Sequence, residues 1–293
     1  MTSIYGEIIR RHSHPLQPLD TGEPPRLSVL EPIDAVLFDI YGTLLISGSG
    51  DIGAGNAAAR GKAIAAAMQA MGVPLQGSSA AALEIWHAEI ERRHQEARQA
   101  GVDAPEVDII EVWRGALAEW TARGWTGSAA GVDLAALSIE FEIRANPVWP
   151  MPGMVQTLRT LHDAGKILGV ISNAQFFTLE TFPALVERTL DGLGCEPDLQ
   201  FYSYQHGRAK PSLALYRLAV AALQRRGIPP GRVLYVGNDM RNDIAPAARC
   251  GFRTALFAGD ARSLRRREGD SQCAGIVPDV VLTELSDLIH CIR

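Results

Sequence analysis

From residue 154 to the C-terminus, short apolar segments alternate with amphipathic ones. Strands are predicted where continuous apolar runs stop at polar or turn residues, and helices where apolar residues recur every three or four positions. The predicted strands are KILGVIS, RVLYVGN, RTALFA and the start of PDVVLTELSDLIHCI, and predicted helices separate them. Strands that alternate with helices indicate a mostly parallel sheet with helices on both faces. We therefore expect an α/β fold with a Rossmann-like, doubly wound core.

The first strand of this sheet is predicted far upstream, at residues 34–38. Between it and the other strands, residues 46–149 contain four predicted helices and no convincing strand. We expect a helical cap of residues 46–149 inserted into a core of residues 33–45 and 150–293. The segments SGSGDIGAGN and NPVWPMPG predict hinges near residues 45–52 and 146–153, about which the cap would close over a cleft.

Residues 1–32 form a separate N-terminal extension. They contain five prolines and no clean periodicity, so we expect a segment that drapes over the body or is partly disordered. A short helix is predicted at Ile4 to Arg11.

Composition excludes several classes of function. The net charge of -5 gives no basic footprint for nucleic acid. No apolar run approaches the length of a membrane helix, and the N-terminus lacks the pattern of a signal peptide. The four cysteines show no paired spacing, which favours reduced thiols and a cytoplasmic protein. We expect a small-molecule substrate, with the cap tryptophans serving either a homodimer or the monomer's own core.

The predicted strands end in polar residues that can carry chemistry. Asp39 follows the first strand, Ser172 ends the second, and Asp239 and Asp243 follow a third, while Lys210 precedes a predicted helix. The carboxyl ends of parallel strands meet at one edge of a sheet, so these side chains can share a cleft. Like charges raise each other's pKa, so a lysine and a divalent cation would be needed to hold the carboxylates together.

Four motifs in this order resemble the haloacid dehalogenase-like (HAD) superfamily of hydrolases. They are FDIYGTL, GVISN, AKPS and GNDMRND, and the resemblance extends from residue 34 to about residue 290. It implies that Asp39 is a nucleophile that forms an aspartyl-phosphate, and that Lys210 neutralises the charge of the transferring group. It also implies that Thr43 steadies the turn near Asp39, and that Ser172 and the backbone of Asn173 hold phosphate oxygens.

The resemblance further implies a Mg²⁺ cofactor. Its ligands would be Asp39, Asp239, Asp243 and the backbone carbonyl of Tyr41, with Asn238 as a substitute for Asp239. The expected function is therefore a Mg²⁺-dependent phosphatase that acts on a small phosphorylated metabolite.

Tyr41 departs from the phosphatase pattern, which has a second aspartate at this position as general acid and base. Tyrosine, with a pKa near 10, is a poor base at neutral pH. Asp-x-Tyr-Gly-Thr instead resembles the metal-independent 2-haloacid dehalogenases, which also require an arginine from the cap, for which Arg60 is a candidate. Against them, a metal-free site would set three carboxylates against one lysine. A binding or regulatory protein without turnover is a third alternative.

Overall fold

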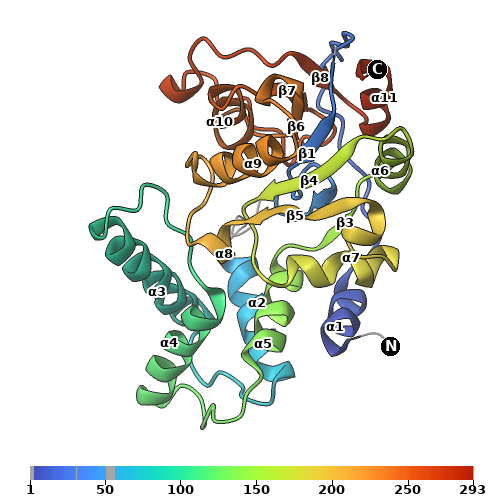
Figure 1. Ribbon diagram of the computed structural model, residues 1–293. Coiled ribbons are helices and arrows are strands. Elements are labelled where there is room, and N and C mark those ends of the chain that lie inside the picture. Colours follow the sequence, from blue (N-terminus) through green and yellow to red (C-terminus); the bar gives the residue numbers. More distant parts are fainter. Residues whose placement is uncertain (1–2, 31, 51–56, 293) are drawn as a thin grey trace.

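A six-stranded parallel sheet forms the centre of the molecule, in the order β5-β4-β1-β6-β7-β8 (Figure 1). The structure is a computed structural model that describes residues 3–30, 32–50 and 57–292. The strands of the sheet are β1 (Ala35–Phe38), β4 (Ile167–Ser172), β5 (Cys195–Tyr202), β6 (Val233–Gly237), β7 (Arg253–Phe257) and β8 (Val280–Leu282). The predicted α/β, Rossmann-like fold class is confirmed.

Alternate residues of β1 pack against opposite helical layers. Val36 and Phe38 belong to the apolar cluster that includes α6 (Met154–Asp163) and α11 (Leu288–Cys291). Ala35 and Leu37 belong to the cluster that includes α9 (Ala214–Arg225) and α10 (Ala245–Arg249). Successive side chains of a strand point to opposite faces, and both faces of this sheet are covered. β1 must therefore be apolar on both sides, and Asp39 is the first residue after this apolar run.

Four helices between β1 and β4 pack on one another and lie to one side of the sheet (Figure 1). They are α2 (Ala57–Ala70), α3 (Ser79–Gln99), α4 (Ile109–Ala122) and α5 (Leu134–Ala145), and we call them the helical insertion. Trp113 packs edge-on against Trp120 and Phe141 at its centre. That these helices close over a cleft stays a prediction, and residues 51 and 52 of the predicted hinge lie outside the described residues.

Three local features differ from the sequence prediction. Residues 45–47 and 148–150 form a short antiparallel ribbon of β2 (Leu45–Ser47) and β3 (Val148–Pro150), too short to show alternation. The sequence prediction missed β5, which lies at the sheet edge, where Pro197 is tolerated although it disrupts the strand pattern. α7 (Thr178–Val186) contains Pro183, although proline normally interrupts a helix.

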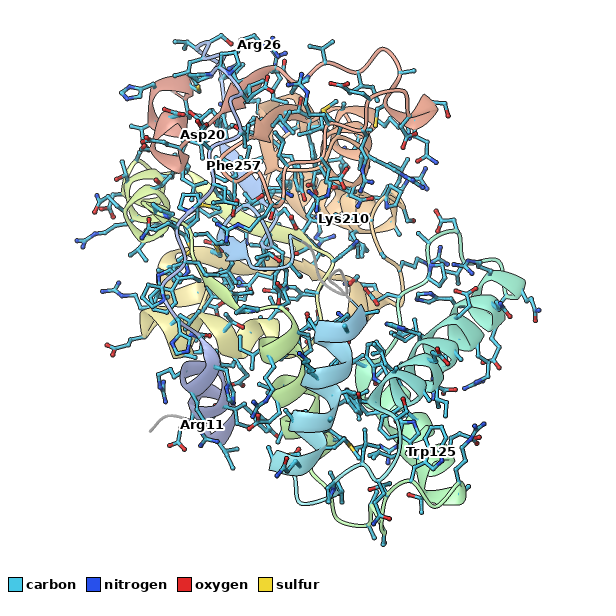
Figure 2. The ribbon with its side chains drawn as sticks, turned by 180° about the vertical axis from the view of Figure 1, so that it is seen from behind. Arg11, Asp20, Arg26, Trp125, Lys210 and Phe257 are labelled. Carbon is cyan, nitrogen blue, oxygen red and sulfur yellow. The ribbon has the colours of Figure 1, made fainter. Side chains whose placement is uncertain are left out.

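The N-terminal extension packs against the rest of the molecule. Its helix α1 (Ile4–His12) packs against α5 of the helical insertion and α7 of the core. The chain then crosses the core past Asp20 and Arg26, both labelled in Figure 2. Arg26 exchanges backbone hydrogen bonds of 2.9 and 3.0 Å with Val281 of β8. No helix among the described residues is long and apolar enough to span a membrane.

Candidate active site

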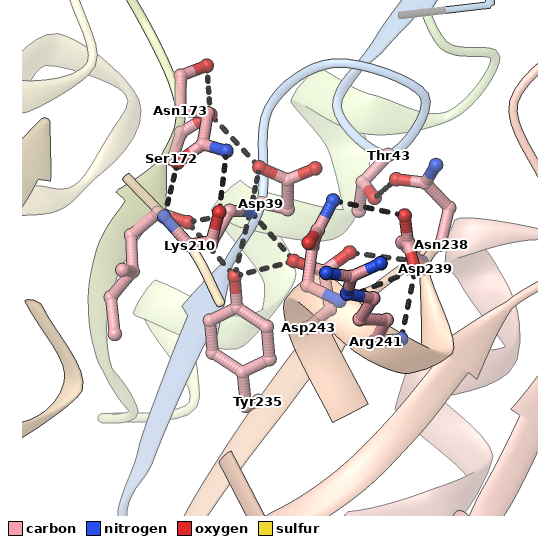
Figure 3. A network of polar contacts seen from close by, with 12 residues as sticks. Asp39, Thr43, Ser172, Asn173, Lys210, Tyr235, Asn238, Asp239, Arg241 and Asp243 are labelled. Carbon is pink, nitrogen blue, oxygen red and sulfur yellow. Dashed lines mark hydrogen bonds and ion pairs between the residues drawn. The ribbon is translucent and has the colours of Figure 1, made fainter. Parts of the chain in front are cut away.

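Asp39 lies at the C-terminal end of the central strand and is held by one of its carboxylate oxygens (Figure 3). Its Oδ1 accepts hydrogen bonds from the hydroxyl of Ser172 at 2.8 Å and from Nζ of Lys210 at 2.6 Å. Within the described part of the chain, no hydrogen bond reaches Oδ2. The carboxylate is therefore oriented by Oδ1, and Oδ2 is available to react.

Lys210 joins two buried carboxylates. Its Nζ lies 2.6 Å from Oδ1 of Asp39 and 2.6 Å from Oδ1 of Asp243. The three residues are only 5%, 6% and 1% exposed for Lys210, Asp39 and Asp243. Burial alone would lower the pKa of Lys210, but the two carboxylates raise it above its usual range. Burial raises the pKa of Asp243, and Lys210 opposes this effect.

The residues after β4 fix the position of Lys210. The side-chain amide of Asn173 accepts a hydrogen bond from the backbone N–H of Lys210 at 2.7 Å. It also donates one to the backbone carbonyl of Lys210 at 3.3 Å. These two bonds hold the loop that carries the lysine against the end of the neighbouring strand. The side chain of Asn173 therefore has a positioning contact that the sequence alone did not reveal.

The turn after β1 and the end of β6 are joined by a separate contact. The hydroxyl of Thr43 donates to Oδ1 of Asn238 at 3.0 Å, and the amide of Asn238 donates to the carbonyl of Ser263 at 2.6 Å. Gly237 is required beside them, because a Cβ there would lie 2.5 Å from Cγ of Asp243. Thr43 thus steadies the turn through Asn238, with no direct hydrogen bond to Asp39 among the described residues.

Asp239 is directed toward an arginine that the sequence analysis did not single out. Its two oxygens accept from Nε of Arg267 at 3.1 Å and from Nη2 at 2.6 Å. Its Oδ1 also accepts from the backbone of Arg241 and Asn242 at the start of the π-helical turn Met240–Ile244. Arg267 follows β7 in a loop with no motif, and only the folded chain brings it to the end of β6.

The three aspartates predicted to bind a metal are paired with cationic side chains of the chain itself. Magnesium prefers near-octahedral oxygen ligands, usually one or two carboxylates with several waters. Here Lys210 lies between Asp39 and Asp243, while Arg267 and the π-helical turn occupy the carboxylate of Asp239. Among the described residues, no group of three or more His, Cys, Asp and Glu side chains could hold a metal ion. The assignment of Tyr41, Asp239 and the other two aspartates to a metal stays a prediction.

The hydroxyl of Tyr41 is engaged with α7. The hydroxyl oxygen lies 2.9 Å from Oγ1 of Thr178, the first residue of α7. Burial raises the pKa of Tyr41 well above its ordinary value of 10, an effect that the hydrogen bond to Thr178 opposes. The phenol therefore keeps its proton at neutral pH and is a poor proton acceptor.

A larger cavity adjoins the small cleft at Asp39. The cleft has a volume of about 30 Å³, and the cavity, of about 290 Å³, lies between the helical insertion and the core. Asn173, which follows β4, lines both spaces. Arg60 of α2 lines the cavity, with its guanidinium carbon 5.0 Å from the ring centre of Phe141 and 5.5 Å from that of Trp86.

The sequence profile of haloacid dehalogenase-like hydrolases matches residues 33–251. The chain belongs to this family. The matched residues include every predicted site residue of the hydrolase and the whole helical insertion, whereas the N-terminal extension lies outside the match. No curated protein matches the sequence.

Solved structures resemble the hydrolase over most of its length. A 2-haloacid dehalogenase from Pseudomonas syringae pv. Tomato DC3000 is 21% identical with a TM-score of 0.54, covering 88% of this chain and 96% of that one. A HAD phosphatase from Thermococcus onnurineus is 18% identical with a TM-score of 0.50, covering 87% and 96%. At these identities the likeness shows the fold alone, and it does not distinguish a phosphatase from a dehalogenase.

Proposed function

We propose that this HAD-like hydrolase is a metal-independent 2-haloacid dehalogenase with Asp39 as its nucleophile. The pairing of Asp239 with Arg267 carries the proposal. Three carboxylates against one lysine would require an added cation. The folded chain instead supplies a second cation of its own, so Lys210 and Arg267 pair with all three carboxylates, Asp39, Asp239 and Asp243, and offset two of their three charges without a metal.

Two further features support a reaction at carbon. Tyr41 stands where a phosphatase needs a proton donor and acceptor, and its buried phenol is engaged with Thr178. Arg60 supplies a guanidinium on the wall of the cavity that the helical insertion forms. An arginine at this place suits the carboxylate of a 2-haloacid, because its planar fork matches that group.

The proposed reaction has two steps. First, Oδ2 of Asp39 attacks the carbon that bears the halogen, the carbon–halogen bond breaks with its electron pair, and halide leaves. This step forms an ester between Asp39 and the substrate. Water then attacks the carbonyl carbon of that ester, which releases a 2-hydroxy acid and a proton and restores the carboxylate. Ser172 and Lys210 hold Oδ1 during both steps, and in the second step they stabilise the negative charge that develops on it.

A Mg²⁺-dependent phosphatase is the second candidate, and one observation favours it. Asp239 and Asp243 both line the cleft beside Asp39, and displacement of halide does not itself require them. If Arg267 released Asp239, the carboxylate oxygens of Asp239 would join those of Asp39 and the carbonyl of Tyr41 as ligands for Mg²⁺. A small phosphorylated metabolite would then be the substrate, with Ser172 and the backbone of Asn173 as contacts for its phosphate.

A paired assay separates the two candidates. Purified enzyme is given 2-chloropropionate in one arm and an aryl phosphate with a panel of small phosphorylated metabolites in the other, each with Mg²⁺ or with a chelator. Halide release that is unchanged by the chelator supports the dehalogenase. Phosphate release that requires Mg²⁺ overturns this proposal in favour of the phosphatase. Ligand binding without turnover in either arm would indicate a binding protein.

A further inference from the structure

The 290 Å³ cavity is too large for the smallest haloacids. It equals the liquid volume of roughly ten water molecules and approaches the lower limit, about 300 Å³, of ordinary small-molecule pockets. A substrate whose only substituent is a methyl group would leave most of this space to water. The cavity therefore has room for a substituent with the bulk of a ring.

The lining of the cavity is mainly apolar and aromatic. Its apolar side chains come from both the helical insertion and the core: Trp86, Ile90, Val107, Ile109, Phe141 and Phe177. Trp86 is only 4% exposed and packs against Phe141 and Trp113, with ring centres 5.2 and 5.9 Å away. A fixed aromatic wall of this kind suits a flat, apolar group, which it contacts by offset or edge-on packing.

Besides Arg60, the titratable groups that line the cavity are two histidines and two glutamates. Burial lowers the pKa of both His87 and His94, which favours their neutral forms. The carboxylate of Glu106 accepts hydrogen bonds from the hydroxyl of Ser203 at 2.6 Å and from the backbone N–H of Val107 at 2.9 Å. Arg60 interacts with the charge of Glu142 on α5. Because two glutamates already line the cavity, its mainly apolar surface favours an uncharged substituent over a second acidic one.

We infer that this cavity selects 2-haloacids that carry an aromatic substituent, and that Trp86 and Ile90 are specificity-determining residues. The inference rests on the proposed dehalogenase function and extends it to a substrate class. The reacting carbon would lie at Asp39, the carboxylate toward Arg60, and the ring between Trp86 and Ile90. This placement requires the molecule to extend past Asn173, which lines both the cleft and the cavity.

The test compares 2-chloro-3-phenylpropionate with 2-chloropropionate in the wild type and in Ile90→Trp, which fills the cavity. We expect the wild type to favour the phenyl substrate at least about tenfold in kcat/KM, the range that one apolar contact provides. Ile90→Trp should lose about tenfold or more on the phenyl substrate and less than about threefold on the methyl one. Ala88→Trp is the matched control, because Ala88 is exposed on the same helix and should change neither value. Ile90→Phe replaces Ile90→Trp if the larger side chain prevents folding.

The outcomes separate this inference from the proposed function. Halide release from the methyl substrate with no preference for phenyl, or an equal loss on both substrates in Ile90→Trp, would overturn the inference and leave the dehalogenase standing. If neither substrate releases halide, calorimetry with the 2-hydroxy acids phenyllactate and lactate tests the cavity directly. Tighter binding of phenyllactate that is lost in Ile90→Trp would support the aromatic site, and equal or absent binding would overturn it.

Discussion

The Asp39 cleft and the neighbouring cavity differ in almost every physical property. The cleft, about 30 Å³ in volume, is lined largely by polar groups, and its buried carboxylates are matched by lysine or arginine. The cavity, about 290 Å³, is lined mainly by aromatic and branched apolar side chains. They are built differently as well, because strand ends shape the cleft whereas helices of the insertion form most of the cavity wall.

This difference indicates a division of labour. Strand ends are fixed by hydrogen bonds to both neighbouring strands, which suits groups that must be placed to within a fraction of an ångström. Helix faces meet through side-chain packing, which tolerates changes in size and so suits the choice of substrate. Substitutions in the cleft should therefore affect every substrate, and those in the cavity should affect substrates selectively.

The largest effect is expected from Asp39→Asn. An amide of the same shape keeps the packing but cannot act as a nucleophile, so turnover should fall at least about a thousandfold for all substrates. Halide release and single-turnover kinetics would measure the loss. Asp34→Asn is the matched control, since Asp34 lies just before the opposite end of β1 in a partly exposed pair with Arg232, and it should retain activity within about twofold. A selective loss on one substrate in Asp39→Asn would contradict the division of labour.

Lys210→Met should destabilise the protein by about 3–5 kcal/mol, because it leaves Asp39 and Asp243 buried without their shared cation. Since the folded-state pKa of Lys210 is raised, its stabilising contribution is fully present below its unfolded pKa of about 10.4 and declines only as pH rises through the higher folded value. Urea unfolding from pH 6 to 9 should therefore show no loss of this contribution in the wild type. Lys62→Met, on an exposed position of α2, should change stability by less than about 0.5 kcal/mol.

The difference between the cleft and the cavity also explains which features could be predicted from the sequence. Continuous apolar runs that stop at polar residues predicted the central strands, and the ends of these strands placed Asp39, Ser172 and Lys210 in one cleft, where the structure brings them together. Arg267 could not be predicted, because it lies in an irregular loop and reaches Asp239 only through pairing between segments far apart in the chain. The cavity was equally hidden, since helical periodicity indicates that Trp86 is apolar but not which space it borders.

Arg267→Gln tests the pairing of Arg267 with Asp239 inside the cleft. Loss of the paired hydrogen bonds to Asp239 should lower the free energy of unfolding by about 1–3 kcal/mol, while halide release should stay within about fivefold because Arg267 does not contact Asp39. Mg²⁺ should raise the melting temperature of the variant more than that of the wild type, since Asp239 is then released. Strong stabilisation of the wild type by Mg²⁺ would instead favour the phosphatase. Arg266→Gln, which loses a surface pair with Glu23, is the neighbouring control.

The smallest effect is expected from Tyr41→Phe, which tests whether the first motif supplies a proton carrier. The variant loses one buried hydrogen bond to Thr178, worth about 1 kcal/mol of stability, and should keep its activity within about threefold. Because burial raises the pKa of Tyr41 above 10, the phenol stays protonated between pH 7 and 10, and the pH profiles of wild type and variant should have the same shape there. A general acid or base at this position would contribute about 10²–10⁴-fold, so a loss of that size, together with a changed profile, would show that Tyr41 takes part in proton transfer.

Thr178→Val provides the matched control, since it removes the same hydrogen bond but keeps the phenol, and stability should fall similarly in both variants. Equal activity in the two variants would place Tyr41 among the residues that hold the turn, and would leave Asp39 with Lys210 as the groups on which the chemistry of the cleft depends.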